Sequence, residues 1–125
     1  MTIRRSVLNF VMATLLIAAP LAAQHRVVLD SQAASHVGQM VTVEGTVASV
    51  HTTRTGTTFL NFGAAYPNQT FTAVIFRSAA SRFPDPQQWS GKEVRVTGQV
   101  RLYRGKPEII LEEPSQVIAV LKRDR

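Results

Sequence analysis

The residues of this chain that could take part in binding or catalysis have aromatic, amide and basic side chains. They lie on or beside a few short apolar segments. Phe59 and Asn61 stand two residues apart in the segment 58–62, where Leu60 and Phe62 are the apolar alternates. In a strand, residues two apart share a face, so we expect Phe59 and Asn61 to point outwards while Leu60 and Phe62 enter the core. An exposed ring beside an amide offers a stacking surface and a hydrogen-bonding group.

Basic residues stand in and around the same predicted sheet. Arg101 and Tyr103 alternate with the apolar residues of a later strand, Arg104 and Lys106 follow in the next turn, and Arg54 lies in the turn before Phe59. Cationic side chains around an aromatic patch suit single-stranded nucleic acid, because cations contact phosphates and rings stack on bases. The alternative is that the basic strand shows only its solvated face, with arginine stems covering apolar surface.

Tyr66 completes the set. It begins the turn Tyr66-Pro67-Asn68, and it either packs over the mouth of the fold or contacts a ligand. The predicted ligand-binding residues are Arg54, Phe59, Asn61, Tyr66, Arg101, Tyr103, Arg104 and Lys106.

The chain offers no pattern typical of catalysis. It contains no cysteine, and His25, His36 and His51 lack metal-ligand spacing. Glu112 and Glu113 are adjacent and would face opposite sides of a strand. No serine stands in a nucleophile-elbow pattern. We therefore predict a protein that is not an enzyme, with no catalytic residue, no metal and no cofactor.

Short β-strands must position these residues. Apolar alternation predicts strands at about 41–50, 58–62, 71–76, 94–102 and 109–111, with a final apolar piece at 117–121. A short helix is expected at 78–83, ended by Pro84-Asp85-Pro86, and another after Asp30 or Ser31, ended by Gly38. Phe83 and Trp89 are expected to plug one end of the core.

A repeated pattern indicates the architecture. Gly38-x-x-Val41-x-Val43-x-Gly45-x-Val47 recurs as Gly91-x-x-Val94-x-Val96-x-Gly98-x-Val100. A glycine inside a strand suits a sharp bend or bulge where a small barrel closes. Five strands with a short helix between the third and fourth predict an all-β, five-stranded OB-fold Greek-key barrel with little α content.

The N-terminus predicts export. Residues 1–23 combine Arg4 and Arg5, an apolar run, and Ala22-Ala23 before a cut at Gln24, as in a secretory signal peptide. An uncleaved anchor is the alternative, and the arginine pair leaves the twin-arginine route open beside general secretion. Removing both arginines lowers the formal net charge from +6 to +4. The predicted organisation is a signal peptide at 1–23, an N-terminal segment at 24–37, the OB-fold domain at 38–121 and a basic tail at 122–125.

From Gly38 to Val120 the chain resembles the OB-fold nucleic-acid-binding superfamily, in particular tRNA-anticodon-binding-like OB domains. The resemblance rests on Gly45 to Arg54, on Phe-Leu-Asn-Phe-Gly at 59–63, and on Gly-Lys-x-Val-x-Val-x-Gly at 91–98. It implies that Phe59 stacks a base and that Arg54 assists. Phe62-Gly63 and the longer turn at 64–68 depart from the family pattern.

The sequence therefore predicts a periplasmic or secreted binding module whose partner is single-stranded DNA or RNA, with affinity that falls steeply with salt. The alternative is an envelope module that binds a protein or an anionic glycan through the same face.

Overall fold

The alternating apolar segments form one sheet of eight strands in the computed structural model, which describes residues 25–121. The predicted signal peptide at 1–23 and the basic tail at 122–125 lie outside the described residues. Within residues 25–121, no helix has the length and apolar character needed to cross a membrane.

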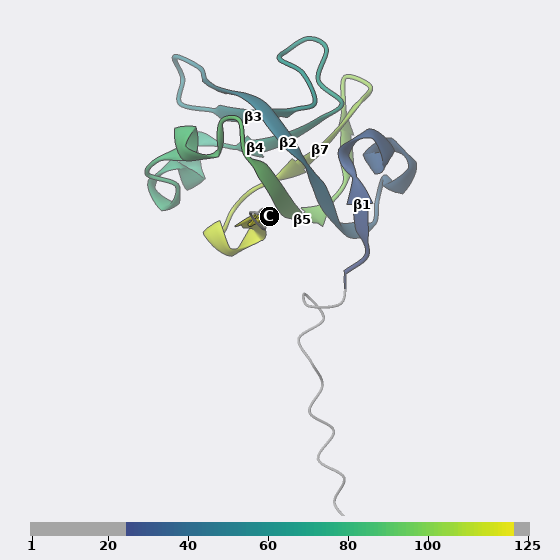
Figure 1. Cartoon of the computed structure of the whole chain (residues 1–125). Coiled ribbons are helices and arrows are strands. Elements are labelled where there is room, and N and C mark those ends of the chain that lie inside the picture. The colour runs from purple at the N-terminus through teal and green to yellow at the C-terminus, as the bar shows by residue number, and fades with distance from the viewer. Residues whose placement is uncertain (1–24, 122–125) are drawn as a thin grey trace, which may run out of the picture.

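The described part of the chain consists of strands with short 3-10 helices between some of them (Figure 1). The strands are β1 (Val27–Leu29), β2 (Met40–Thr52), β3 (Thr58–Phe62), β4 (Phe71–Ile75), β5 (Glu93–Gln99), β6 (Arg101–Tyr103), β7 (Lys106–Ile110) and β8 (Val117–Ala119). The 3-10 helices are η2 (Asp30–His36), η3 (Arg77–Arg82), η4 (Pro86–Trp89) and η5 (Pro114–Gln116).

The strand order confirms the predicted barrel. Neighbouring strands follow the order β6-β7-β4-β3-β2-β5-β8, and β1 pairs with β2 in parallel. β4 and β7 are also parallel, whereas the remaining pairs are antiparallel. β5 and β6 succeed one another across Val100, so one bent strand pairs with β2 at one end and with β7 at the other. The fold is all-β and of the OB type, with η3 and η4 between the third and fourth barrel strands.

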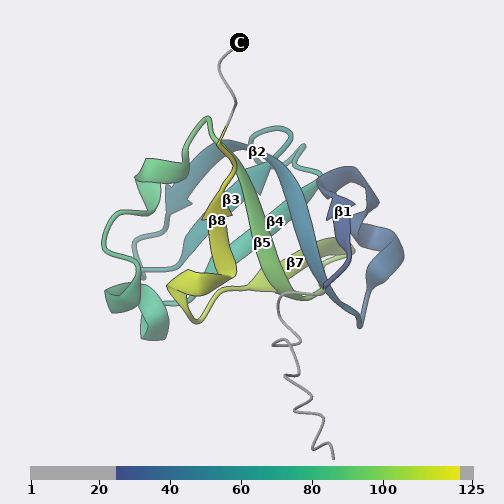
Figure 2. The ribbon, with the colours of Figure 1, turned by 60° about the horizontal axis from the view of Figure 1, so that its bottom comes forward.

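β1 and β8 add to the five predicted strands. Figure 2 shows β8 beside β5 and β1 beside β2. Three-residue strands of this kind carry too short an alternation to be separated from loop by pattern alone.

The core lies where the alternation places it. Leu60 and Phe62 are fully buried, as predicted, and so are the valines that flank Gly45 and Gly98. Phe83 is buried but Trp89 is only half-buried, so the predicted aromatic plug is confirmed for Phe83 and holds in part for Trp89. Their rings meet edge-on at 6.2 Å.

The repeated glycines have a steric reason. A Cβ atom on Gly98 would lie 2.5 Å from Cγ2 of Ile109, which is fully buried. On Gly45, a Cβ atom would lie 2.9 Å from Cγ of Asp30 and 3.0 Å from Cδ2 of Phe62. Both strands therefore carry glycine because a neighbouring element packs directly against their backbone.

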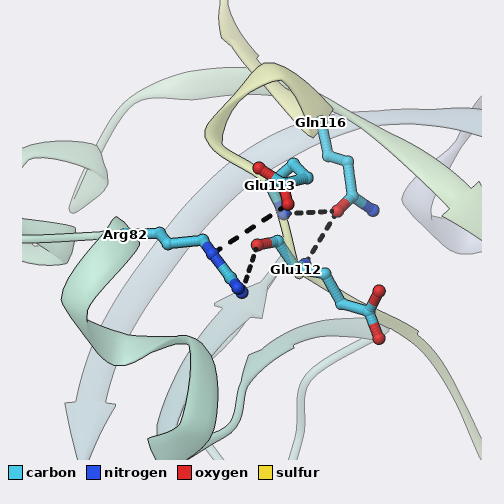
Figure 3. Close-up of polar contacts among 4 residues, drawn as sticks. All are labelled: Arg82, Glu112, Glu113 and Gln116. Carbon is cyan, nitrogen blue, oxygen red and sulfur yellow. Dashed lines mark hydrogen bonds and ion pairs between the residues drawn. The ribbon is translucent and has the colours of Figure 1, made fainter.

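Gln116 ties the C-terminal strand to the barrel (Figure 3). Its Oε1 accepts hydrogen bonds from the backbone N–H groups of Glu112 (2.7 Å) and Glu113 (2.9 Å). Its Nε2 donates to the carbonyl oxygens of Thr97 (3.0 Å) and Ile110 (3.2 Å). Arg82 adds a bond from η3 to the Glu112 carbonyl. One amide thus connects β5, β7 and η5.

Replacing Gln116 by alanine should lower the free energy of unfolding by about 2 kcal/mol, because four backbone groups lose their partner. Chemical denaturation measures the change. Gln87→Ala is the control, since Gln87 makes a single side-chain bond, to the Val50 carbonyl. Equal stability losses in the two variants would contradict the role assigned to Gln116.

Candidate functional site

A groove of about 800 Å³ lies on the sheet face opposite the core, over β2, β3, β4 and β7. The β3–β4 loop and the β6–β7 hairpin bound it on one side. These two connections and the β2–β3 turn stand along the same edge of the molecule, at the top of Figure 1. Six of the eight predicted ligand-binding residues line the groove: Phe59, Asn61, Tyr66, Tyr103, Arg104 and Lys106.

A row of polar side chains crosses the groove floor from strand to strand. Strand register places Ser49 opposite Asn61, Asn61 opposite Thr72, Thr72 opposite Glu108, and Glu108 opposite Arg101. Neighbours in such a row lie close enough to interact. Nδ2 of Asn61 donates to Oγ of Ser49 at 3.2 Å, and Nε of Arg101 lies 3.0 Å from Oε1 of Glu108.

Asn61 corrects part of the prediction. It shares the face of Phe59 and lines the groove, as expected, but it is only 3% exposed. Its amide is therefore part of the groove floor and is reached only from inside the groove. A planar ligand would have to enter the groove with its edge towards the floor to form a hydrogen bond with this amide.

Glu108 is the main groove residue that the sequence analysis missed. Its side chain is nearly buried, and this desolvation raises the pKa of its carboxyl above the ordinary value, while the charge and hydrogen bond of Arg101 act in the opposite direction. Ile109, the next residue, is fully buried in the core. The signal was available: beside a core residue of a strand, Glu108 had to face the opposite side, which carries Phe59 and Asn61.

The raised pKa of Glu108 predicts a pH-dependent stability. A carboxyl that binds its proton more tightly in the folded chain stabilises the fold below its ordinary pKa of 4.5, and this contribution is lost as pH rises through the raised pKa. Lowering the pH from about 7 to about 5 should therefore raise the free energy of unfolding of the wild type relative to that of Glu108→Gln. Urea denaturation at both pH values measures the shift. If the wild type and Glu108→Gln differ in stability by the same amount at both pH values, the prediction is wrong.

Three aromatic rings form the upper surface of the groove. Phe59 is half-buried on β3, Tyr103 is 50% exposed at the end of β6, and Tyr66 is 74% exposed in the β3–β4 loop. Of the two roles left open for Tyr66, this exposure favours ligand contact. The guanidinium of Arg104 lies 5.3 Å from the ring centre of Tyr103, within cation–π range.

A two-residue turn holds Arg104 in that position. Arg104 has a φ of 49° and Gly105 a φ of 78°. Positive φ at both central residues is the geometry of a type I′ hairpin turn, whose twist matches that of the flanking strands. The turn therefore sets Arg104 beside the groove.

Lys106 lines the groove and also has hydrogen-bond partners within the chain. Its ammonium group donates to the carbonyl of Pro67 and lies 3.4 Å from the carbonyl of Gln69 and 3.5 Å from its Oε1. All three acceptors belong to the β3–β4 loop that carries Tyr66. At the opposite end of this loop, Oγ1 of Thr70 donates to Oδ2 of Asp30 and to the Phe62 carbonyl. Lys106 is thus a positioning residue for the loop.

Replacing Lys106 by methionine keeps the aliphatic stem and removes the ammonium group. The amide of Asn68, which bonds the Ala65 carbonyl within the loop, should then exchange with solvent deuterium roughly tenfold faster. Hydrogen exchange of the ligand-free protein measures this. Arg104→Gln, on the same hairpin, should leave the rate unchanged, and an unchanged rate in Lys106→Met would contradict the anchoring role.

Arg54 and Arg101 do not line the groove. Arg54 is exposed in the β2–β3 turn, beyond its end, and Arg101 is paired with Glu108 at its edge. The strand that carries Arg101 and Tyr103 also bends at Val100. Arg95, before the bend, pairs with Glu44 on the other part of the sheet (3.2 Å). The groove is therefore less cationic than predicted. Within residues 25–121, no group of three or more histidine and acidic side chains could hold a metal ion.

The chain is similar to known proteins in its structure but not in its sequence. No protein-family model matches the chain, and no curated protein matches it in sequence. Among solved structures, the aspartyl-tRNA synthetase of Entamoeba histolytica aligns with 82% of this chain at a TM-score of 0.53 and 13% identity. The asparaginyl-tRNA synthetase of the same organism aligns with 78% at 0.52 and 19% identity. This chain spans 23% of each synthetase.

A third structure is a small protein of similar size. OBody AM1L10, bound to hen egg-white lysozyme, aligns with 70% of this chain and 85% of its own length, at a TM-score of 0.51 and 20% identity. At these identities the likeness concerns the fold, which agrees with the OB-type barrel described above.

Proposed function

We propose that this OB-type domain binds single-stranded nucleic acid in the groove, without catalysing a reaction on it, and that it does so after export. The observation that carries the proposal is the combination, in one groove, of the Phe59 ring with the floor amide of Asn61. Base stacking on an aromatic ring contributes about 1 to 3 kcal/mol per base. Fold neighbours named as tRNA synthetases are compatible with this ligand class.

The polar floor suits a base more than a phosphate. Glu108 lies on the floor beside Asn61 and Thr72, and a carboxylate repels phosphate oxygens but accepts hydrogen bonds from the amino and imino groups of bases. A single strand leaves these base edges free, whereas a duplex uses them in pairing. The proposal therefore specifies single-stranded ligands.

Few cationic side chains remain free to contact the phosphate backbone of a nucleic acid. The expected salt dependence of binding is therefore lower. Arg101 is paired with Glu108 and Lys106 holds the loop, so Arg104 and Arg54 are the predicted site residues left to contact phosphates. With two or three phosphates neutralised, affinity should fall roughly tenfold between about 50 and 200 mM salt. This dependence is shallower than the four cationic residues among the eight predicted ones had suggested.

The test is a fluorescence-anisotropy titration of the protein from Gln24 onwards against labelled single-stranded DNA and RNA, at both salt concentrations. Saturable binding with the expected salt slope, competed by unlabelled single strands and weakly by duplex, supports the proposal. Absence of binding at low salt refutes it.

A specific observation favours one alternative. The fold neighbour OBody AM1L10 is bound to a protein, hen egg-white lysozyme, so a protein is the second candidate partner for this groove. In that case the labelled oligonucleotides would not bind. A protein or an anionic glycan of the envelope would instead bind at Phe59 and Tyr66.

A further inference from the structure

An exposed aromatic residue continues the groove face beyond the end of β4. Phe71, Ala73 and Ile75 point into the core, so Thr72 and Val74 point to the groove side. The backbone is still extended at Phe76 (φ −70°, ψ 157°), which places Phe76 on the same side as Thr72 and Val74. Phe76 is 41% exposed.

Strand register sets Phe76 beside Phe59. Phe59 pairs with Val74 on β4, and Phe76 follows Val74 by two residues. It is therefore the diagonal neighbour of Phe59, at about 7 to 8 Å, a separation that aromatic side chains span. Two rings at this spacing form a track that leads out of the groove.

Two arginines stand where this track ends. Arg77 follows Phe76 directly and is exposed. Its stem packs against the β2–β3 turn, since a Cβ atom on Gly56 would lie 3.2 Å from Cγ of Arg77. Arg54 is in the same turn, which lies above η3 in Figure 1. Neither arginine forms an ion pair with any residue of the described part of the chain.

We infer that Phe76 and Arg77, with Arg54, form an extension of the binding site that takes the next nucleotides of a single strand leaving the groove. Phe76 supplies a stacking surface and the two guanidinium groups contact phosphates. The inference rests on the proposed function and adds a binding segment that the groove alone does not contain. The occupant is the same strand, because the ring track is continuous with Phe59 and its end is cationic.

The experiment measures affinity for labelled single strands of three and of eight nucleotides, in the wild type and in Phe76→Ala and Arg77→Gln. The trimer is short enough to be held by the groove, whereas the octamer reaches the extension. Each variant should lose roughly three- to tenfold of octamer affinity and less than twofold of trimer affinity. Arg77→Gln should also lower the salt slope for the octamer by about 0.7. Arg26→Gln, an equal change of charge on the β1 side, is the matched control.

The outcomes separate this inference from the proposed function. Phe59→Ala should weaken both lengths, because both occupy the groove. If the wild type binds the octamer no more tightly than the trimer, or if the Phe76 and Arg77 variants leave the octamer unaffected, the extension is wrong and the groove site stands. If neither strand binds at low salt, the proposed function fails and the extension fails with it.

Discussion

Replacing Phe59 by alanine should lower the affinity for single-stranded nucleic acid about tenfold to hundredfold. The ring lies within the groove, flanked by the buried Asn61 amide, and stacking on one base contributes about 1 to 3 kcal/mol. Truncation removes the stacking surface but leaves the polar floor in place. Anisotropy titration against a labelled single strand measures the change.

Two further variants make this result specific to stacking. Phe59→Tyr retains a ring and should bind almost as the wild type does, whereas Phe59→Leu retains apolar bulk and should lose most of the affinity. Because Phe59 is only half-buried, the melting temperature should change little in all three. Equal binding by the leucine variant and the wild type would show that Phe59 does not stack a base.

The largest expected loss of stability comes from Phe62→Ala, at about 3 to 5 kcal/mol. Phe62 is fully buried, its ring meets that of Phe71 edge-on at 5.1 Å, and it packs against the backbone at Gly45. Truncation leaves a cavity at the junction of β2, β3 and η2 that these close neighbours cannot fill. Chemical denaturation measures the loss.

Leu102→Ala is the matched control, because Leu102 is 50% exposed on β6 and its truncation should change stability by about 0.5 kcal/mol or less. A loss below about 1 kcal/mol for Phe62→Ala would mean that Phe62 is not part of the packed core.

Local patterns were sufficient to predict most of the barrel. Alternation around Leu60 and Phe62 marked β3 and assigned its two faces, and the glycine–valine repeat marked β2 and β5. These elements depend on residues close together in the chain, where side-chain period and turn chemistry act directly. Phe59 and Tyr103 followed from the alternation of their strands, whereas Tyr66 and Arg104 followed from the turns that carry them.

The remaining differences arise from contacts between distant segments. Lys106 reaches carbonyl groups almost forty positions earlier in the chain, and Arg101 meets Glu108 only because β6 folds back on β7. Asn61 lies between Ser49 on β2 and Thr72 on β4 and is only 3% exposed. No periodicity within a strand reports such partners, so the sequence identified basic residues but not the acceptors that already engage them.

The most direct test of the central claim is an amide chemical-shift titration of the protein with a single-stranded oligonucleotide at low salt. We expect saturable shifts confined to the groove, at residues 49–51, 59–61, 65–69 and 103–108, continuing to Phe76 and Arg77 for longer strands. Shifts centred instead on β1 and β8, or no shifts at all, would contradict the assignment of the groove as a nucleic-acid site.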